Sequence, residues 1–261
     1  KSFLAPEEWK NQDVVLEFEG IYGTARVWIN GALASVNRNG YMGFSVDLKP
    51  WICYGQENLI KIDVDNSNQP NSRWYTGSGI YRDVNLWTGK GVYIPHDEMK
   101  ITTLSVNDDV AVVEVCAKLK NTKECGMEAK CQFELIFEGK TVVTEKQNIV
   151  FYSERTETVR VQLPVKCPKK WSTDHPNLYQ CCAKTYIDDE MCDEYTVDFG
   201  IRTLALDPVN GFQINGETVN LRGTCIHHDN GVIGAETFPE AEWYRCKRLK
   251  EAGFNAIRSS H

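Results

Sequence analysis

The chain ends in the stretch Phe254-Asn255-Ala256-Ile257-Arg258-Ser259-Ser260-His261, which has the pattern of a buried β-strand followed by polar groups. A second strand-like stretch over residues 218–226 is followed by His227-His228-Asp229. A helical pattern over residues 237–253 separates the two stretches. The end of the chain therefore predicts a strand, helix, strand unit with parallel strands.

The helix has recognisable start and stop signals. Thr237 and Glu240 fit a capping box, and Pro239 occupies the first turn, where proline is tolerated. Gly253 fits the usual glycine stop at the C-terminal end. The spacing predicts a single helix between the two strands.

Parallel strands joined by a helix place their carboxyl ends on one rim. The residues after Ile226 and after Arg258 should therefore emerge together, which predicts that His227 and His261 are neighbours. In an eight-stranded α/β barrel this rim is the active-site face, but a whole barrel needs roughly 250 residues. We expect residues 204–261 to be the start of a truncated TIM barrel.

The N-terminal part, residues 1–94, is rich in strands. Residues 14–19 alternate, with Leu16 and Phe18 expected to point inward, and Asn30-Gly31 is a strong hairpin signal after the strand over residues 25–29. Short strands with turn residues between them predict an antiparallel sandwich. Further strands are expected over residues 44–48, 59–64 and 80–86.

A second strand-rich block covers residues 95–203. Alternating apolar residues mark strands over residues 111–119, 133–137, 159–163 and 195–199. About seven strands in about 100 residues is typical of an immunoglobulin-like sandwich. A hairpin around Asn215-Gly216 then leads into the C-terminal unit. The fold class expected for the whole chain is mainly β.

Charge and composition limit the partners. The 261 residues carry a formal net charge of −7, and the Lys and Arg residues are scattered, so we expect no nucleic-acid partner. No apolar stretch reaches the roughly 20 residues that span a bilayer, and the N-terminus lacks a signal-peptide core. The ten cysteines form no CxxC pair and resemble small apolar residues in strands, which favours a cytoplasmic location.

Three stretches together resemble glycoside hydrolase family 2, the family of β-galactosidases, β-glucuronidases and β-mannosidases. Residues 66–84 contain Arg73-Trp74 and Gly79-Ile80-Tyr81-Arg82-Asp83-Val84, and are similar to the signature near the end of the family's jelly-roll sugar-binding domain. Trp171-Ser172 through Leu178-Tyr179, with Phe199-Gly200-Ile201-Arg202, is similar to the end of its immunoglobulin-like domain. Residues 215–229 and 253–261 are similar to the start of its barrel.

The resemblance implies a retaining β-glycosidase that uses two glutamates, one as acid/base and one as nucleophile, on later barrel strands. Those strands lie beyond residue 261, so the resemblance assigns no catalytic residue to this chain. Glu236, Glu240 and Glu242 match no catalytic position. No cofactor is expected, and a metal site built from His227-His228-Asp229 alone is implausible because adjacent side chains on an extended chain point apart.

The resemblance also implies substrate-binding residues. His227 and His261 are expected to contact sugar hydroxyls, and Asp229 is expected to line the same pocket. Arg258 could orient the nucleophilic carboxylate through a bidentate pair or form a structural ion pair. Arg73 and Trp74 could reach the barrel mouth, with the indole stacked on a sugar, or pack between domains.

The sequence is therefore identified as part of a β-galactosidase-like enzyme, because the stretch from His227 to Gly231 resembles the β-galactosidase branch. A carbohydrate is the expected substrate, and homo-oligomerisation is left open. The alternatives are a β-glucuronidase or β-mannosidase of the same family, or a non-catalytic carbohydrate-binding or scaffold module.

Overall fold

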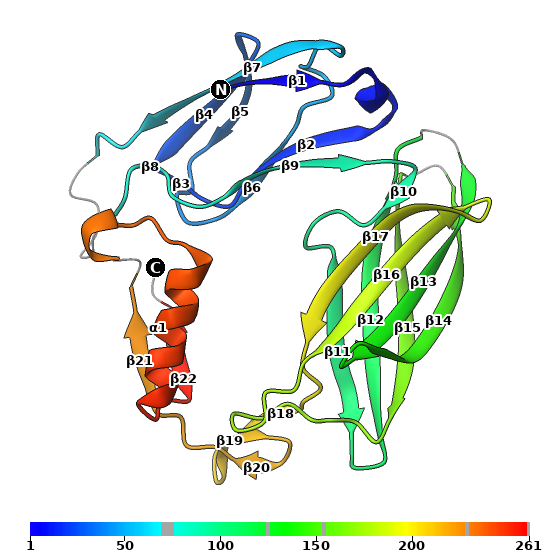
Figure 1. Ribbon diagram of the computed structural model, residues 1–261, viewed down its shortest axis with the longest axis vertical. Coiled ribbons are helices and arrows are strands. Elements are labelled where there is room, and N and C mark those ends of the chain that lie inside the picture. The colour runs from blue at the N-terminus through cyan, green and yellow to red at the C-terminus, as the bar shows by residue number, and fades with distance from the viewer. Residues whose placement is uncertain (69–75, 124–125, 153–154, 228–229, 260–261) are drawn as a thin grey trace. The chain divides into compact units, whose positions relative to one another are not determined.

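The computed structural model describes residues 1–68, 76–123, 126–152, 155–227 and 230–259 (Figure 1). Contacts within the chain define two compact units. The first unit combines Lys1–Thr88 with Leu221–His261, and the second is Gly89–Asn220. The three domains expected from the sequence, residues 1–94, 95–203 and 204–261, remain a prediction.

The first unit begins with a set of short antiparallel strands. They form three sheets, β1-β7-β4-β5, β6-β2-β9 and β3-β8. A 3-10 helix lies at Glu7–Asn11. The strands are β1 (Ser2–Ala5), β2 (Asp13–Phe18), β3 (Ile21–Tyr22), β4 (Thr24–Ile29), β5 (Ala32–Asn37), β6 (Phe44–Asp47), β7 (Gln56–Asp65), β8 (Gly79–Ile80) and β9 (Val84–Gly89).

Alternation along β2 builds the core of this part. Leu16 and Phe18 are buried, as predicted, and Phe18 stacks on Phe44 with ring centroids 4.9 Å apart. The predicted hairpin turn between β4 and β5 is also confirmed, because Asn30 and Gly31 both adopt positive φ, at 51° and 86°.

The strand expected over residues 80–86 is interrupted, so that prediction is wrong in its extent. The chain forms β8 and β9 instead, and Tyr81 lies between them. A Cβ atom on Gly20 would lie 2.7 Å from Tyr81 Cζ, so the ring packs directly on the Gly20 backbone. The Tyr81 hydroxyl also donates to the Gly40 carbonyl oxygen at 2.8 Å. These contacts hold Tyr81 out of the strand pairing.

The second unit is a sandwich of two antiparallel sheets. One sheet has the order β10-β12-β11 with β15 paired to β12, and the other has the order β14-β13-β16-β17. Val113 and Val115 from the first sheet and Phe133 and Leu135 from the second lie in one buried core. The mainly β fold class is thus confirmed. The strands are β10 (Val92–Tyr93), β11 (Met99–Val106), β12 (Val110–Asn121), β13 (Met127–Phe137), β14 (Lys140–Phe151), β15 (Thr156–Lys166), β16 (Tyr179–Ile187) and β17 (Glu190–Phe199).

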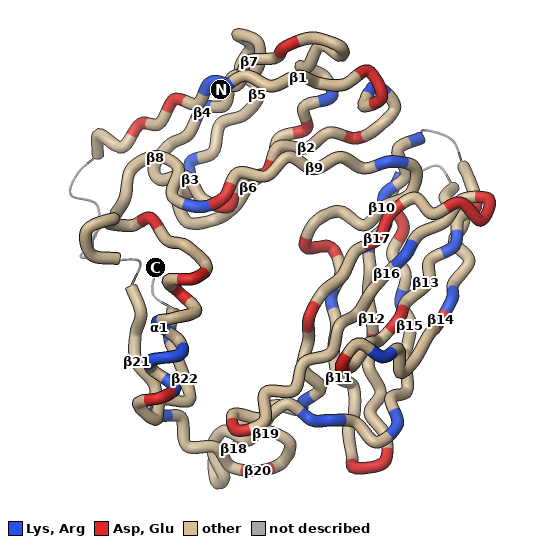
Figure 2. The backbone as a smooth tube through the Cα atoms, viewed as in Figure 1, with Lys and Arg blue, Asp and Glu red and all other residues tan. Residues whose placement is uncertain are grey.

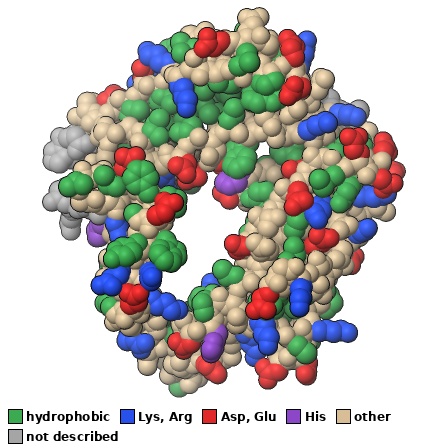
Figure 3. Space-filling model, in the orientation of Figure 1, with side chains coloured by type: hydrophobic (Ala, Val, Ile, Leu, Met, Phe, Trp, Pro, Cys, Tyr) green, Lys and Arg blue, Asp and Glu red, His purple; other side chains and the backbone are tan. Residues whose placement is uncertain are grey.

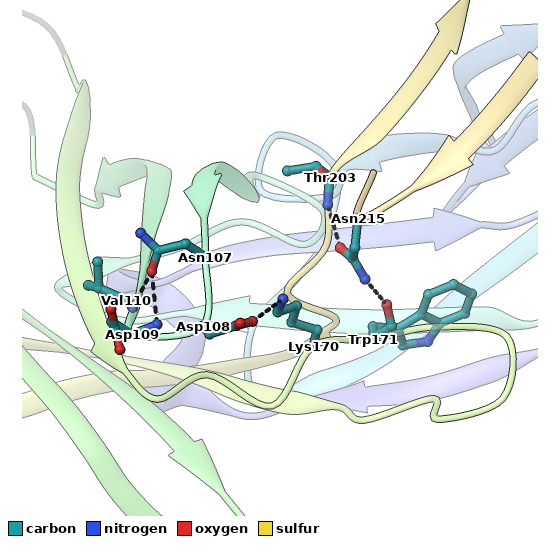
Figure 4. A network of polar contacts seen from close by, with 8 residues as sticks. All are labelled: Asn107, Asp108, Asp109, Val110, Lys170, Trp171, Thr203 and Asn215. Carbon is teal, nitrogen blue, oxygen red and sulfur yellow. Dashed lines mark hydrogen bonds and ion pairs between the residues drawn. The ribbon is translucent and has the colours of Figure 1, made fainter. Parts of the chain in front are cut away.

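A small three-stranded antiparallel sheet completes the second unit, and its last two strands form a hairpin. The strands are β18 (Leu204–Asp207), β19 (Gly211–Ile214) and β20 (Glu217–Thr218). The predicted Asn215-Gly216 turn is confirmed by φ angles of 54° and 82°. Figure 4 shows how Asn215 fastens the hairpin: its side-chain amide donates to the Trp171 carbonyl oxygen at 3.0 Å and accepts from the Thr203 N–H at 3.1 Å.

The remaining elements of the first unit form the predicted strand, helix, strand unit. They are β21 (Gly223–Ile226), a 3-10 helix (Gly231–Ile233), α1 (Pro239–Glu251) and β22 (Ala256–Ser259). Strands β21 and β22 pair in parallel, and the register places Ile226 opposite Ser259. The parallel pairing is confirmed, whereas the TIM barrel that it would begin remains a prediction.

Two local predictions for this segment are wrong. The strand expected over residues 218–226 is split into β20 and β21. The capping box is absent, because the helix is preceded by Phe238, which makes no side-chain cap, and the Thr237 hydroxyl donates to Glu242 Oε1 at 2.6 Å instead. The C-terminal stop is confirmed by the φ of +89° at Gly253.

Positive and negative side chains are mixed along the chain, and the described cysteines are free thiols. Figure 2 shows Lys and Arg interspersed with Asp and Glu along both units. The nine described cysteines are free thiols, and burial raises the pKa of Cys131 and of Cys181 to about 12, so these two behave as small apolar residues. Within the described residues, no helix has both the length and the apolar character needed to cross a membrane.

Candidate functional site

A cavity of about 280 Å³ lies within the first unit. Its lining comes from two parts of that unit that are far apart in the sequence, the N-terminal strands and the C-terminal strand, helix, strand segment. We call it the first cavity. Its lining residues are Tyr22, Tyr41, Thr76, Gly77, Tyr81, Arg82, Ile226, His227, Ala235, Thr237, Glu242, Arg245 and Ser259.

Aromatic rings form one wall of the first cavity. Tyr22 and Tyr41 meet edge to face with their ring centroids 5.3 Å apart. Gly40 allows this approach, since a Cβ atom there would lie 2.3 Å from the Tyr22 ring. Burial raises the pKa of Tyr81, with Arg82 acting in the opposite direction, so the Tyr81 hydroxyl stays protonated at neutral pH.

The carboxyl ends of the parallel strands form another wall. Ile226 ends β21, His227 follows it, and Ser259 ends β22. All three residues line the first cavity. The structure therefore places the ends of both strands at one cavity, as the parallel arrangement predicts.

Helix α1 contributes a polar cluster to the lining. Arg245 Nη1 lies 3.4 Å from Glu242 Oε2 and donates to the His227 carbonyl oxygen at 3.3 Å. Arg245 Nη2 also donates to the Asn230 side-chain oxygen. Glu242, which matches no catalytic position of the family, accepts a hydrogen bond from the Thr237 hydroxyl and forms an ion pair with Arg245. The cluster fixes the start of α1 against the segment that follows β21.

The predicted site residues are distributed as follows. His227 lines the first cavity, whereas Arg258 is exposed, does not line it, and has its Nη1 3.8 Å from Cys225 Sγ. The other four predicted positions lie outside the described residues: Arg73, Trp74, Asp229 and His261. The assignment of all six residues to substrate binding remains a prediction.

Sequence reasoning missed most of the cavity wall. Tyr81 and Arg82 belong to the stretch that carries the family resemblance, so the motif itself indicated that they could lie near the site. Tyr22 and Tyr41 each lie next to a glycine but belong to no motif. Arg245 was treated only as part of a helix. Only the folded chain brings these residues together.

Among the described residues, no group of three His, Cys, Asp or Glu side chains is placed to hold a metal ion. The first cavity instead offers hydroxyl, imidazole, guanidinium and carboxylate groups beside aromatic rings. A mixture of hydrogen-bonding groups and aromatic faces suits a polar ligand with exposed C–H faces, as a sugar has.

Comparison with known proteins gives a consistent result. Residues 1–90 match the model for the sugar binding domain of glycosyl hydrolases family 2, and residues 92–202 match the model for glycosyl hydrolases family 2. The chain is 36% identical over 247 residues to the β-galactosidase BoGH2A of Bacteroides ovatus, covering 94% of this chain and 29% of that protein. It is 35% identical to a putative β-glucuronidase of Formosa agariphila, covering all of this chain and 24% of that protein.

The fold comparison agrees. The crystal structure of a glycosyl hydrolase family 2 member from Bacteroides cellulosilyticus matches the whole chain with a TM-score of 0.96 and 36% identity, over 36% of the solved chain. The present chain spans between 24% and 39% of the length of the curated relatives it matches. The chain belongs to glycoside hydrolase family 2.

Proposed function

We propose that this chain is part of a retaining β-glycosidase that hydrolyses terminal β-galactosides, and that its first cavity contributes to the binding of the terminal sugar. The observation that carries the proposal is the lining of this cavity, which joins His227 and Ser259 at the strand ends to the aromatic residues Tyr22 and Tyr41. Hydroxyl groups of a sugar can bond to the polar side chains while its C–H faces contact the rings.

One of the two guanidinium groups in the first cavity is already engaged by protein oxygen atoms. The Arg245 guanidinium forms an ion pair with the Glu242 carboxylate. It also donates hydrogen bonds to the His227 carbonyl oxygen and to the Asn230 side-chain oxygen. Arg82 lies over the Tyr81 ring, with its Cζ 5.2 Å from the ring centroid. A uronic acid would be expected to require a guanidinium aimed at its carboxylate. Among the described residues, the engagement of Arg245 supports a galactoside over a glucuronide, whereas the ring contact of Arg82 leaves its N–H groups able to donate.

In the whole enzyme the reaction would follow the retaining course of the family. One carboxylic acid protonates the glycosidic oxygen while a carboxylate attacks the anomeric carbon, and water then hydrolyses the covalent glycosyl-enzyme. We propose that both carboxylates lie outside this chain. The contribution of the present residues is binding and orientation of the sugar.

A pair of assays tests the proposal. The chain is titrated by calorimetry with methyl β-galactoside and with methyl β-glucuronide, and it is incubated with nitrophenyl β-galactoside. We expect saturable binding of the galactoside, at least tenfold weaker binding of the glucuronide, and no release of nitrophenol above background. Preference for the glucuronide would reject the galactoside assignment, and sustained turnover would reject the placement of the catalytic carboxylates outside the chain.

A further inference from the structure

The segment over residues 230–237 lies between β21 and α1, and we call it the β21–α1 segment. Ala235 and Thr237 in this segment line the first cavity, as do His227 before it and Arg245 after it. Of these four residues, the proposed function uses only His227 as a contact of the sugar. Whatever fixes the β21–α1 segment in place therefore also shapes the first cavity.

Hydrogen bonds within the β21–α1 segment close it on itself. The Asn230 N–H donates to the Gly234 carbonyl oxygen at 2.8 Å, and Asn230 Nδ2 donates to the Glu236 carbonyl oxygen at 2.7 Å. Gly231 and Gly234 make this closure possible, because both adopt positive φ, at 65° and 67°. A segment bonded to itself in this way should move as one piece, so a contact at one of its residues places all of them.

Arg245 ties one side of the β21–α1 segment to helix α1. Its Nη1 donates to the His227 carbonyl oxygen at 3.3 Å, and its Nη2 donates to the Asn230 side-chain oxygen. Glu242 Oε2 lies 3.4 Å from Arg245 Nη1, and Glu242 Oε1 accepts from the Thr237 hydroxyl at 2.6 Å. A planar guanidinium presents several donors in fixed directions, which a lysine ammonium does not. One side chain thus fastens both ends of the segment's approach to α1.

Gly77 meets the other side of the β21–α1 segment. A Cβ atom on Gly77 would lie 2.9 Å from Ala235 Cβ, inside the roughly 3.5–4.0 Å at which carbon atoms pack. The backbone of Gly77 does not adopt positive φ, so glycine is needed here for space and not for its conformation. Asn66 Nδ2 donates to the Gly77 carbonyl oxygen at 3.4 Å, which ties Gly77 to the residue that follows β7.

We propose that Arg245 and Gly77 are positioning residues of the first cavity. Arg245 holds the β21–α1 segment and the His227 backbone against α1, and the missing side chain of Gly77 lets Ala235 approach the N-terminal part of the first unit. This inference rests on the proposed function, because the terminal sugar is assigned there to the first cavity. Both residues act through the segment, and neither is assigned a contact with the sugar. Binding groups have to be held within about 0.5 Å of their working positions by such supporting contacts.

A pair of substitutions tests the contact at Gly77. In Gly77→Ala the new methyl group displaces Ala235, so we expect the dissociation constant of methyl β-galactoside to rise about tenfold. Combining Gly77→Ala with Ala235→Gly removes the clash and should bring the constant back to within about twofold of the unaltered chain. Calorimetry on the whole chain separates affinity from folding, because unfolded chain lowers the fitted stoichiometry and leaves the constant unchanged.

Arg245→Lys tests the guanidinium while it keeps the positive charge. A single ammonium cannot serve the oxygen atoms of His227 and Asn230 in the same geometry, so the dissociation constant of methyl β-galactoside should again rise about tenfold. The matched control is Arg248→Lys in the same helix. Arg248 pairs with Glu251 at 3.1 Å and does not line the first cavity, so this change should leave the constant as it is.

A spectroscopic measurement on the free chain needs no sugar. The NMR signal of the His227 imidazole Cε1–H, assigned by its loss in His227→Ala, reports the surroundings of that ring. We expect the signal to shift in Arg245→Lys and in Gly77→Ala, to return in the combination of Gly77→Ala with Ala235→Gly, and to stay in place in Arg248→Lys.

The outcomes separate this inference from the proposed function. If the unaltered chain binds methyl β-galactoside and both Arg245→Lys and Gly77→Ala bind it equally well, the positioning roles are overturned and the galactoside proposal stands. A loss in Gly77→Ala that Ala235→Gly does not relieve overturns the assigned contact between these two residues. Absence of binding by the unaltered chain overturns the proposed function and this inference with it.

Discussion

The Tyr81 hydroxyl donates a hydrogen bond to the carbonyl oxygen of Gly40, 2.8 Å away, and so joins two segments that lie 41 residues apart in the sequence. Gly40 directly precedes Tyr41, and both Tyr41 and Tyr81 line the first cavity. The bond therefore connects two parts of the wall of the first cavity, and its removal should affect ligand binding as well as stability.

Tyr81→Phe removes only this hydroxyl. Loss of one hydrogen bond to a part-buried carbonyl should lower the free energy of unfolding by about 1–2 kcal/mol, as measured by urea denaturation. Because this bond holds Gly40 beside Tyr41, methyl β-galactoside binding at the first cavity should also weaken. The control is Tyr152→Phe, at a tyrosine that is 75% exposed. Equal stability of the two variants would contradict the assigned role of the bond.

Asn215→Ala tests the attachment of the β19–β20 hairpin to the sandwich of the second unit (Figure 4). The change leaves the Trp171 carbonyl and the Thr203 N–H without their partner and puts alanine at a positive φ. We expect a loss of about 2–3 kcal/mol in unfolding free energy and faster amide exchange in β19 and β20. Asn210→Ala removes a side-chain hydrogen bond to Asp207 within one turn and should cost less than half as much. Unchanged exchange in β19 would exclude this fastening role.

The C-terminal segment of the first unit should be the least stable part of the chain. Helix α1 has no buried residue, and Figure 3 shows hydrophobic side chains on its surface, where Trp243 is 64% and Tyr244 59% exposed. Few buried contacts mean a low free energy of local opening. Hydrogen exchange followed by mass spectrometry should show residues 221–259 exchanging before β12 and β13. Slower exchange in α1 than in β12 would show that this ranking is wrong.

Glu134 should give the stability a measurable pH dependence. Lys184 Nζ donates to Glu134 Oε2 at 3.0 Å, and this bond holds the pKa of Glu134 below its usual value. A lowered carboxyl pKa in the folded state adds stability above the unfolded value of about 4.3, and the added stability disappears as the pH falls through the lowered folded pKa. Urea denaturation between pH 7 and pH 3 should therefore show a smaller loss for Glu134→Gln than for the control Glu128→Gln on the same strand. Parallel curves for the two variants would rule out the contribution.

The sequence predicted the strands well where alternation was strong. Leu16 and Phe18 are buried as expected, and the Asn30-Gly31 and Asn215-Gly216 turns form because both residues tolerate positive φ. The strand ending at Ile226 and the strand ending at Ser259 pair in parallel, so the joint rim was also predictable.

The errors arise where tertiary contacts override local patterns. Tyr81 interrupts its strand because its ring packs on Gly20 and its hydroxyl bonds to Gly40, neither of which is visible in the local sequence. The Thr237 hydroxyl bonds to Glu242 in place of capping the helix. The meeting of Tyr22 with Tyr41 depends on the packing at Gly40, so this part of the candidate site could not be derived from spacing.

The central claim is that the first cavity binds a terminal β-galactosyl unit, with His227 as one of its contacts. The most direct measurement is the dissociation constant of methyl β-galactoside for the unaltered chain, for His227→Ala, and for the control His175→Ala, which lies in the second unit. Loss of a polar contact should raise the constant for His227→Ala about tenfold and leave His175→Ala unchanged. Equal constants for all three proteins would contradict the placement of the sugar in the first cavity.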